Sequence, residues 1–361
     1  MDKKVRIGII GCGGIANGKH MPSLAQLDNV EMVAFCDIIE ERAVEAAKKY
    51  GTEDAKVYTD YKELLKDETI DVCHVCTPNR SHSFITVDAL EAGKHVMCEK
   101  PMAKTYADAK LMLEAAKRTG KKLTIGYQNR QTDENRYVKS VCDAGELGEI
   151  YFAKAHAIRR RAVPTWGVFL NEYEQGGGPL IDIGTHALDL TLWMMNNYKP
   201  KMVVGNTFRK LVDQTDTANA WGDWDPEKFT VEDAAFGYIT MENGAVIELD
   251  ATWALNYRHP KEATYTLCGT KAGVDTDDGL WINSVKHGRQ TAEEIDLSAG
   301  GVAFYDGKKV NNSVLDMAQW IDAVVNDHDP CVLPEQALCV TQILEAIYTS
   351  AKTGKPVFFD D

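Results

Sequence analysis

Three residue types that carry proton and hydride chemistry stand at two places in the 361-residue sequence. Asp182 and His186 lie four residues apart, shortly after the run 176–178 of three glycines, and Lys100 stands between a glutamate and a proline. A neutral imidazole can take the proton of a hydroxyl near neutral pH, and a carboxylate can orient that ring. A lysine ammonium can stabilise negative charge on a reacting oxygen. Together these residues suit the transfer of a hydride and a proton from an alcohol.

Asp182 and His186 are predicted to share one face of a helix. Residues 187–195, ALDLTLWMM, have a helical pattern, and a helix that begins near Ile183 places side chains four residues apart on the same side. The glycines allow close approach to a ligand or a turn that a side chain would block. A structural interpretation stays open, in which Asp182 is the helix N-cap and His186 a buried, hydrogen-bonded histidine. No metal site is expected, because zinc generally takes three protein ligands and no third one is visible.

A second group of residues is suited to bind a dinucleotide. In GIIGCGGIA, Gly11, Gly13 and Ala16 fill the pattern G-x-G-x-x-A between a predicted strand and a predicted helix. These small residues allow a tight turn, approach of the backbone to a pyrophosphate, and close packing of helix and strand. Asp37 ends the next strand, where a carboxylate accepts from ribose hydroxyls and repels a 2′-phosphate. We expect NAD rather than NADP, although Arg42 is close enough in sequence to leave NADP open.

The first part of the chain, which must position Lys100 and the glycines, alternates strands and helices. Such alternation predicts a parallel sheet with helices on both faces. The predicted strands are 4–11, 30–37, 71–78, 94–101 and 121–128, and the predicted helices are 40–51, 83–93 and 107–120. Lys100 then stands at the carboxyl end of a strand, at the edge of the sheet where ligands bind.

From about residue 149 the pattern changes to longer alternating segments, at 150–161, 234–241, 245–255 and 262–269. Short turns such as MENGA predict a mostly antiparallel sheet, and two amphipathic helices follow at 313–325 and 334–354. We expect a Rossmann α/β domain at 1–126, an α+β domain at 127–310, and C-terminal helices at 311–361 that pack back near the domain junction. The loop 213–229, which contains two tryptophans, has no period and is expected to cover a site or to meet another subunit.

Composition disfavours several classes of partner. A net charge of −14 argues against nucleic acid and anionic membranes. The sequence has no export signal and no apolar run of about 18 residues. Its nine cysteines form no disulfide framework, which favours the cytoplasm. Cys73 and Cys76 are expected on opposite faces of a strand, which disfavours a shared metal or redox role. The basic patch 159–161 is either a solvated strand end or the rim of an active site.

The motifs resemble those of the glucose-fructose oxidoreductase and inositol dehydrogenase family (Gfo/Idh/MocA). They are GCGGIA, TPNRSH, EKP and GGGPLIDIGTH, in that order along the whole chain. The resemblance implies an N-terminal Rossmann domain, a C-terminal sheet with an open face for subunit contacts, and an active site at the domain junction. It also implies that Lys100, Asp182 and His186 are catalytic, and that the peptide before Pro101 is cis.

The resemblance further implies which residues contact the ligands. Those expected to contact NAD are Gly11, Gly13, Gly14, Ile15, Asp37, Thr77, Pro78, Asn79, His82, Glu99, Lys100 and Gln128. Those expected to contact the substrate are Lys100, Tyr127, Arg130, Arg159, Trp166, Asp182 and His186. The Trp166 ring suits the apolar side of a pyranose, and arginines can donate to hydroxyls or a carboxylate. Tyr127 and Arg130 have an alternative role in packing at the domain junction.

We therefore expect an NAD-dependent oxidoreductase that acts on a secondary alcohol of a sugar or glycoside, with the C3 hydroxyl of a glucose-type pyranose favoured. The alternatives are an inositol dehydrogenase, an NAD-dependent glycosidase that oxidises its substrate transiently, and a non-catalytic sugar or nucleotide sensor. A dehydrogenase accumulates NADH whereas the glycosidase does not, and three intact catalytic residues argue against the sensor. The other expected partner is a second copy of the chain, because an uncovered sheet face favours a dimer or a higher homo-oligomer.

Overall fold

The computed structural model describes residues 4–214, 216–297 and 311–359, which form two units. The first unit contains residues 4–131 and 311–338, and the second contains the remaining described residues. Each unit is therefore built from two segments of the chain. Helix α10, Pro334–Thr353, contributes its first residues to one unit and the rest to the other. The predicted boundary at residue 310 lies outside the described residues.

The described part of the first unit holds a six-stranded parallel sheet in the order β3-β2-β1-β4-β5-β6. Its strands are β1 (Val5–Ile10), β2 (Val30–Cys36), β3 (Lys56–Tyr58), β4 (Val72–Val75), β5 (His95–Cys98) and β6 (Leu123–Ile125). This order is that of the Rossmann fold and confirms the prediction. Strand β3 was not predicted, because three half-exposed or exposed residues at a sheet edge make no apolar run.

Helices connect these parallel strands. They are η1 (Ala16–His20), α1 (Met21–Leu24), α2 (Glu40–Tyr50), α3 (Tyr61–Leu65), η2 (Asn79–Ser81), α4 (His82–Glu91), α5 (Tyr106–Thr119), η3 (Gln128–Gln131) and α9 (Asn312–Val325). Local sequence sets their ends: Thr105 caps α5 through the N–H of Asp108, and Gly120 ends it at a φ of +65°. Helix α9 adds Met317 and Trp320 to the core of the parallel sheet.

The described part of the second unit holds a nine-stranded sheet in the order β14-β13-β12-β11-β7-β10-β9-β8-β15. The strands are β7 (Ile150–Ile158), β8 (Pro200–Phe208), β9 (Ala234–Met241), β10 (Val246–Thr252), β11 (Lys261–Gly269), β12 (Ala272–Asp275), β13 (Trp281–Lys286), β14 (Arg289–Glu294) and β15 (Val357–Phe358). Strands β7 and β10 are parallel, and the other neighbouring strands are antiparallel. The predicted, mostly antiparallel sheet is confirmed.

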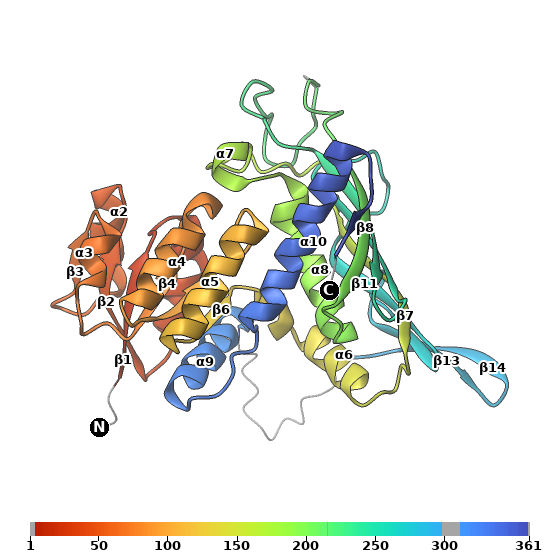
Figure 1. Ribbon diagram of the computed structural model, residues 1–361, viewed down its shortest axis with the longest axis horizontal. Coiled ribbons are helices and arrows are strands. Elements are labelled where there is room, and N and C mark those ends of the chain that lie inside the picture. Colours follow the sequence, from red (N-terminus) through yellow and green to blue (C-terminus); the bar gives the residue numbers. More distant parts are fainter. Residues whose placement is uncertain (1–3, 215, 298–310, 360–361) are drawn as a thin grey trace. The chain divides into compact units, whose positions relative to one another are not determined.

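Helices cover one face of this mixed sheet (Figure 1). They are η4 (Leu180–Gly184), α8 (Thr185–Met195) and most of α10, while α6 (Asp133–Asp143) packs on α8 and the short α7 (Glu172–Gln175) precedes η4. Helix α8 packs on β7 and β11, and Ile347 of α10 packs on Gly205 of β8 and Gly237 of β9. The opposite face carries ion pairs such as that of Lys154 with Glu248. Among the described residues, none of the helices has both the length and the apolar character needed to cross a bilayer.

Candidate functional site

The glycine fingerprint forms the turn between β1 and a helix that begins at Gly14. Gly11 has a φ of +91°, and a Cβ there would lie 2.8 Å from the backbone of Cys76. By contrast, Gly13 and Gly14 face open space, with no described atom within 4 Å of the position that a Cβ would occupy. A helix N-terminus behind bare backbone attracts a phosphate, so the residues present fit a dinucleotide.

Asp37 follows β2 and holds this turn in place. One carboxylate oxygen accepts from the N–H of Cys12 at 2.9 Å, and the other accepts from the N–H of Ile39 at 2.9 Å. The Asn17 side chain donates to the carbonyl oxygens of Cys12 and Gly13 at 2.8 and 3.0 Å. The acid thus stands at the predicted place beside the fingerprint, and its contact with a ribose stays a prediction.

His82 ties the T-P-N turn to the E-K-P turn. Its Nδ1 lies 2.8 Å from the carbonyl oxygen of Pro101, and its Nε2 lies 2.9 Å from that of Thr77. The ring is buried, and burial lowers the pKa of His82. The peptide between Lys100 and Pro101 is cis, as the resemblance implied. Two segments predicted to contact NAD are therefore joined through one buried imidazole.

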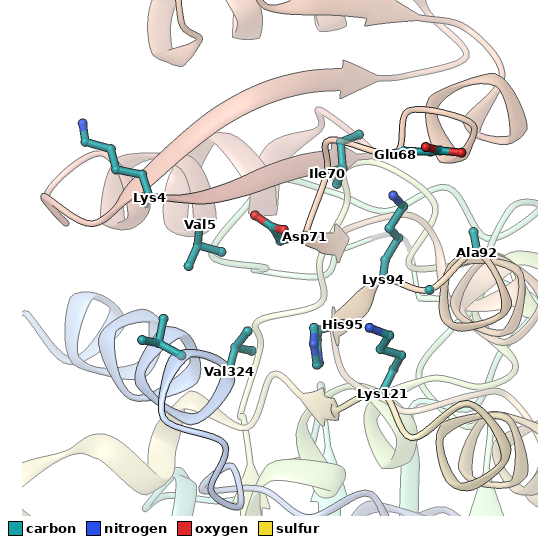
Figure 2. Close-up of a pocket in the computed structure, with 12 residues that line it drawn as sticks. Lys4, Val5, Glu68, Ile70, Asp71, Ala92, Lys94, His95, Lys121 and Val324 are labelled. Atoms are coloured by element: carbon teal, nitrogen blue, oxygen red, sulfur yellow. The ribbon is translucent and has the colours of Figure 1, made fainter. Parts of the chain in front are cut away.

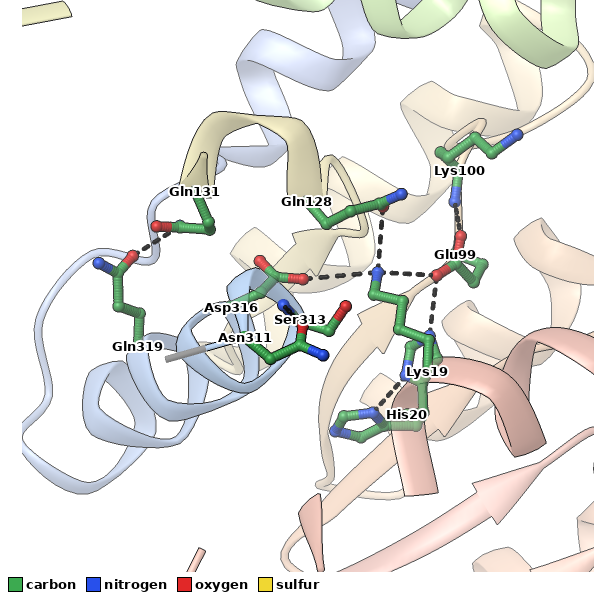
Figure 3. A network of polar contacts seen from close by, with 11 residues as sticks. Lys19, His20, Glu99, Lys100, Gln128, Gln131, Asn311, Ser313, Asp316 and Gln319 are labelled. Atoms are coloured by element: carbon green, nitrogen blue, oxygen red, sulfur yellow. Dashed lines mark hydrogen bonds and ion pairs between the residues drawn. The ribbon is translucent and has the colours of Figure 1, made fainter. Parts of the chain in front are cut away.

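A buried network of charges supports the backbone of Lys100 (Figure 3). The N–H of Lys100 donates to Oε2 of Glu99 at 3.1 Å. Oε1 of Glu99 is 3.1 Å from Nζ of Lys19 and 2.8 Å from Nε2 of His20. Nζ of Lys19 also lies 3.1 Å from Oε1 of Gln128 and 3.5 Å from a carboxylate oxygen of Asp316 in α9. One cation thus joins the helix after the fingerprint, the end of β5, η3 and α9.

The charges in this network set the protonation of its members. Burial alone would raise the pKa of Glu99, but Lys19, the hydrogen bond from His20, and Lys100 hold it well below its usual value. Burial would lower the pKa of Lys19, but Glu99 and Asp316 raise it. Glu99 is therefore a carboxylate and Lys19 an ammonium. Glu99 and Gln128 were predicted to contact NAD; the structure shows both bonded to Lys19, and their contact with NAD stays a prediction.

Asp182 and His186 form the open part of an otherwise buried helix. Between Gly177 and Leu192, a stretch described throughout, they are the only side chains that are not buried. Asp182 lies in the π-helical turn η4, a local geometry that is frequent at functional sites. Its carboxylate accepts from the indole N–H of Trp253 at 3.0 Å. Pro179 occupies the N-cap position, so the interpretation of Asp182 as the N-cap is wrong.

The three glycines before this helix make room for the protein's own atoms. Gly176 has a φ of +85° and ends α7. A Cβ on Gly177 would overlap the hydroxyl of Tyr348, and one on Gly178 would overlap the backbone carbonyl of Glu232. The glycine run was expected either to let a ligand approach or to form a turn that a side chain would block, and the structure supports the second interpretation.

Glu232 is a buried acid that the sequence analysis did not single out. Its carboxylate accepts from the N–H groups of Gly178 and Leu180 at 2.8 and 3.2 Å, and from the hydroxyl of Tyr348 at 2.8 Å. Burial raises the pKa of Glu232 to about 7, against the effect of these hydrogen bonds. This side chain caps the helix that carries Asp182, and no local pattern could have shown it because it lies 54 residues from Gly178.

Arg159 and Trp166, both predicted to bind substrate, lie beyond the end of β7. The Arg159 guanidinium donates to Glu262 at 2.6 Å and to the carbonyl oxygen of Ala162 at 3.3 Å. Burial alone would lower the pKa of Arg159, but Glu262 and Asp182 raise it, so Asp182 is near enough to act on this cation. Trp166 is exposed. The basic patch 159–161 was expected to be either a solvated strand end or the rim of an active site. Arg159 is paired with Glu262 and influenced by Asp182, so it is not merely a solvated residue at a strand end.

Tyr127 and Arg130, also predicted to contact substrate, are buried. The guanidinium of Arg130 donates to the carbonyl oxygen of Cys331 at 2.9 Å and to Oε1 of Gln336 at 2.7 Å. These contacts lie within the first unit and account for Arg130 as a packing residue. Contact of either side chain with a substrate stays a prediction.

A cavity of about 400 Å³ lies at the other end of the parallel sheet (Figure 2). Val5 begins β1, Asp71 precedes β4, and His95 begins β5, so the cavity is at the amino ends of the strands, with Val324 of α9 beside it. The glycine fingerprint stands at the carboxyl ends. The cavity is therefore separate from the nucleotide site.

The cysteine side chains form no disulfide bonds in the described residues. All nine lie in the described residues and are free thiols. Cys73 and Cys76 are both buried, and burial raises the pKa of each. Within the described ranges, no group of three or more His, Cys, Asp or Glu residues is arranged to hold a metal ion.

Comparison with known proteins matches both units to one oxidoreductase family. Residues 5–127 match its NAD-binding Rossmann fold, and residues 139–359 match its C-terminal alpha/beta domain, both under the name GFO_IDH_MocA. D-glucoside 3-dehydrogenase of Escherichia coli (strain K12) is 35% identical over 360 residues, which are 98% of this chain and 97% of the relative.

One further relative and one solved structure are also similar to this chain. Inositol 2-dehydrogenase of Salmonella typhimurium is 35% identical over 198 residues, 54% of this chain and 56% of the relative. The solved structure of a levoglucosan dehydrogenase in complex with NADH has a TM-score of 0.81, covers 99% of both chains and is 21% identical, so it supports the fold alone.

Proposed function

Because the chain belongs to the Gfo/Idh/MocA family of oxidoreductases, we propose that it oxidises the C3 hydroxyl of a glucose-type pyranose or of its glycosides. As a member of this family it is an NAD-dependent dehydrogenase of sugar CH–OH groups. The choice of C3 and of a glucoside rests on the relative that is 35% identical over nearly the whole chain, a D-glucoside 3-dehydrogenase.

The observation that carries this proposal is the pair of open polar side chains on a buried helix. A carboxylate and an imidazole four residues apart on a helix that is buried from Gly177 to Leu192 need a purpose other than packing. The hydrogen bond from the indole of Trp253 fixes the position of the Asp182 carboxylate. Such an arrangement suits the binding and deprotonation of a hydroxyl.

Each residue then has a defined part in the reaction. Bound NAD supplies the acceptor for the hydride that leaves the carbinol carbon. His186 takes the hydroxyl proton on its imidazole, and Asp182 orients that ring or holds the neighbouring hydroxyl. Lys100 stabilises the developing alkoxide with its positive charge. Glu99 and the network of Lys19 act through the backbone of Lys100 and are positioning residues.

An inositol dehydrogenase is the second candidate. Inositol 2-dehydrogenases match at the same 35% identity, but they align with only about half of each chain. The substrate ring differs from a pyranose chiefly in lacking the ring oxygen and the anomeric carbon. A glycoside substrate and an inositol are therefore distinguished by whether a group at the anomeric carbon affects turnover.

Turnover of a substrate panel tests the proposal. The purified protein is mixed with NAD and with glucose, methyl and aryl glucosides, disaccharides and inositols, and NADH is followed by its absorbance. We expect steady NADH formation with glucosides and oxidation at C3 by NMR of the product. Turnover of inositols alone supports the second candidate, and product release without NADH accumulation supports a glycosidase.

A substitution separates chemistry from cofactor binding. His186→Asn keeps a polar side chain of similar size, and we expect it to lower kcat by at least about 100-fold, because a general base contributes roughly 100-fold or more. NAD affinity, measured by fluorescence of NADH, should stay the same. Equal loss of turnover and of NADH binding would show that His186 is structural instead.

The proposed partner besides the substrate is a second copy of the chain. The face of the mixed sheet opposite α8 carries the half-exposed pair of Lys154 with Glu248 and the pair of the buried His156 with Asp250. We place a homo-oligomer contact there and the protein in the cytoplasm, where free thiols persist. Light scattering of the wild type and of a Glu248→Arg variant tests the contact, since a monomer in both cases would contradict it.

A further inference from the structure

The two tryptophans of loop 213–229 have opposite surroundings. Trp224 is 5% exposed, and its indole N–H donates to the carbonyl oxygen of Val212 at 2.7 Å. Its ring packs edge to face on Phe229, which in turn lies against Trp253. Trp221 is 44% exposed. Trp224 therefore anchors the loop in the core, whereas the core does not need the exposed ring of Trp221.

The backbone beside Trp221 is nevertheless fixed. The Asn219 side chain accepts from the N–H of Val163 at 2.8 Å and donates to its carbonyl oxygen at 3.0 Å. The N–H of Ala220 donates to the carbonyl oxygen of Arg161 at 3.0 Å. The hydroxyl of Thr165 donates to the carbonyl oxygen of Trp221 itself at 2.8 Å. Four hydrogen bonds thus hold the loop on the segment that carries Trp166, so the exposed ring is held in one place in advance of binding.

Trp221 and Trp166 form an aromatic corner. Their ring centroids are 4.8 Å apart and the rings are nearly perpendicular, at 83°. Trp166 is 51% exposed and also packs edge to face on Phe169. The guanidinium carbon of Arg159 lies 5.3 Å from the centre of the Trp221 ring. Because Glu262 neutralises Arg159, the corner presents apolar faces beside a compensated charge and suits a neutral ring rather than an anion.

The aromatic corner, Trp166 with Trp221, is connected to Asp182 through the same strand end. Trp253 donates to the carboxylate of Asp182, and its carbonyl oxygen accepts from the N–H of Ala162 at 3.0 Å. The charge of Asp182 raises the pKa of Arg159 together with Glu262, so Arg159 lies within electrostatic reach of Asp182 on one side and against Trp221 on the other. Arg159 therefore stands between the aromatic corner and Asp182, beside which the reacting hydroxyl is proposed to bind.

We propose that the aromatic corner binds the ring attached to the anomeric carbon of the substrate, either a second sugar or an aryl group. This inference rests on the proposed function and narrows the substrate class from free sugars to glycosides. A group at C1 extends away from a hydroxyl at C3, so a pyranose that reacts beside Asp182 can project its C1 substituent past Arg159. Sugar and aryl rings both stack on indole faces, which accounts for the exposed rings of Trp166 and Trp221 on two segments that are hydrogen-bonded to each other.

A matched pair of substrates tests this inference, methyl β-D-glucoside and phenyl β-D-glucoside, with cellobiose as a third. We expect Trp221→Ala and Trp166→Ala each to lower kcat/KM for phenyl glucoside and cellobiose by about threefold to tenfold, the size of one aromatic contact. Trp221→Ala should change kcat/KM for methyl glucoside by less than about twofold. Trp221→Phe, which keeps a ring, should restore most of the difference.

Tyr151→Ala is the matched control, because Tyr151 is 54% exposed and is the second residue of β7, roughly 25 Å along the strand from Arg159. It should leave the ratio of kcat/KM for the two glucosides unchanged.

Equal effects of the tryptophan variants on kcat/KM for both glucosides would overturn the inference while leaving the proposed function intact. A changed native mass without a changed ratio would also overturn it and would assign the corner to a subunit contact. If no glucoside yields NADH, the proposed function fails first, and equilibrium binding of phenyl glucoside to the wild type and to Trp221→Ala decides whether the corner binds a ring.

Discussion

The two glycine-rich turns of this protein look alike in sequence and do opposite things. Each precedes a helix that contains a π-helical turn, η1 in the first unit and η4 in the second. In the first, Gly13 and Gly14 face open space. In the second, Gly177 and Gly178 are covered by atoms of Tyr348 and Glu232. A run of glycines before a helix therefore signals a backbone that must stay bare, and only the structure shows whether a ligand or the chain itself fills the space.

The same difference appears in the charge at each helix. The carboxylate of Glu232 takes the N–H groups of Gly178 and Leu180, which is the position that an anionic ligand would occupy at a helix N-terminus. The helix after Gly13 instead carries the buried cation Lys19, which is satisfied by Glu99 and Asp316. Lys19 and Lys100 hold the pKa of Glu99 well below its usual value, whereas burial raises the pKa of Glu232, which only uncharged donors hold.

The largest expected effect comes from removing the cation. Lys19→Met leaves Glu99 and Asp316 buried without a compensating charge, and we expect a loss of about 3–5 kcal/mol in the free energy of unfolding, measured in urea. Glu99→Gln should cost less, because Lys19 keeps Asp316. Lys228→Met, which removes an exposed ion pair with Asp225, should cost less than about 1 kcal/mol. If Glu99→Gln proved as costly as Lys19→Met, uncompensated charge would not be the cause.

Filling the second turn should come next. Gly177→Ala forces a methyl group into the hydroxyl of Tyr348, and we expect a loss of about 2–3 kcal/mol of stability. The double variant with Tyr348→Phe should recover part of that loss, since the overlapping atom is gone. Thermal unfolding of the three variants gives the coupling energy. Additive effects would mean that the methyl group is accommodated in another way.

Filling the first turn should spare stability and weaken NAD instead. Gly13→Ala adds a methyl group to open space, so the unfolding free energy should change by less than about 0.5 kcal/mol. We expect the Kd for NADH to rise about tenfold, equivalent to about 1.4 kcal/mol, because the backbone can no longer approach the pyrophosphate. Gly18→Ala is the control, since Gly18 is also open but lies further along the helix. Similar losses of NADH affinity in both would refute a specific role for Gly13.

The smallest expected effect is a change in the dependence of stability on pH. The pKa of Glu232 is raised to about 7 in the folded protein, so the folded state binds more protons than the unfolded state between pH 4.5 and 7. Stability from this group is therefore greatest at low pH and falls as the pH rises through this range. Glu232→Gln should flatten the profile, as measured by urea unfolding at several pH values. A profile that keeps its slope would assign the effect to another group.

The sequence predicted those features whose residues all lie in one continuous segment of the chain. The strand, turn and helix around Gly11 and Gly13 are consecutive, so their pattern predicted the Rossmann fold and its parallel sheet. The alternating segments from 150 onward predicted the mixed sheet for the same reason. Asp182 and His186 were predicted on one helix because four residues of spacing is a local property.

Residues that act through distant partners could not be found in this way. Lys19 has the composition of a surface lysine, and its burial depends on Asp316 from α9. Glu232 caps a helix 54 residues away. Trp221 and Trp224 are three residues apart in one loop, and only the fold separates the buried ring from the exposed one. Such roles arise from tertiary packing, which local sequence patterns do not encode.

The first unit is built from two segments of the chain, so it can finish folding only after its second segment, 311–338, has been synthesised. Residues 4–131 leave the ribosome first, but Met317, Trp320 and Ile321 of α9 belong to the core of their sheet, and Asp316 belongs to the ion network around Lys19. Until residue 338 has emerged, the nascent parallel sheet exposes an apolar surface and a half-compensated lysine, a state that chaperones bind and that aggregates readily. An N-terminal fragment cut at residue 131 would lack these side chains of α9, so we expect it to be less stable than the same fragment with α9 attached.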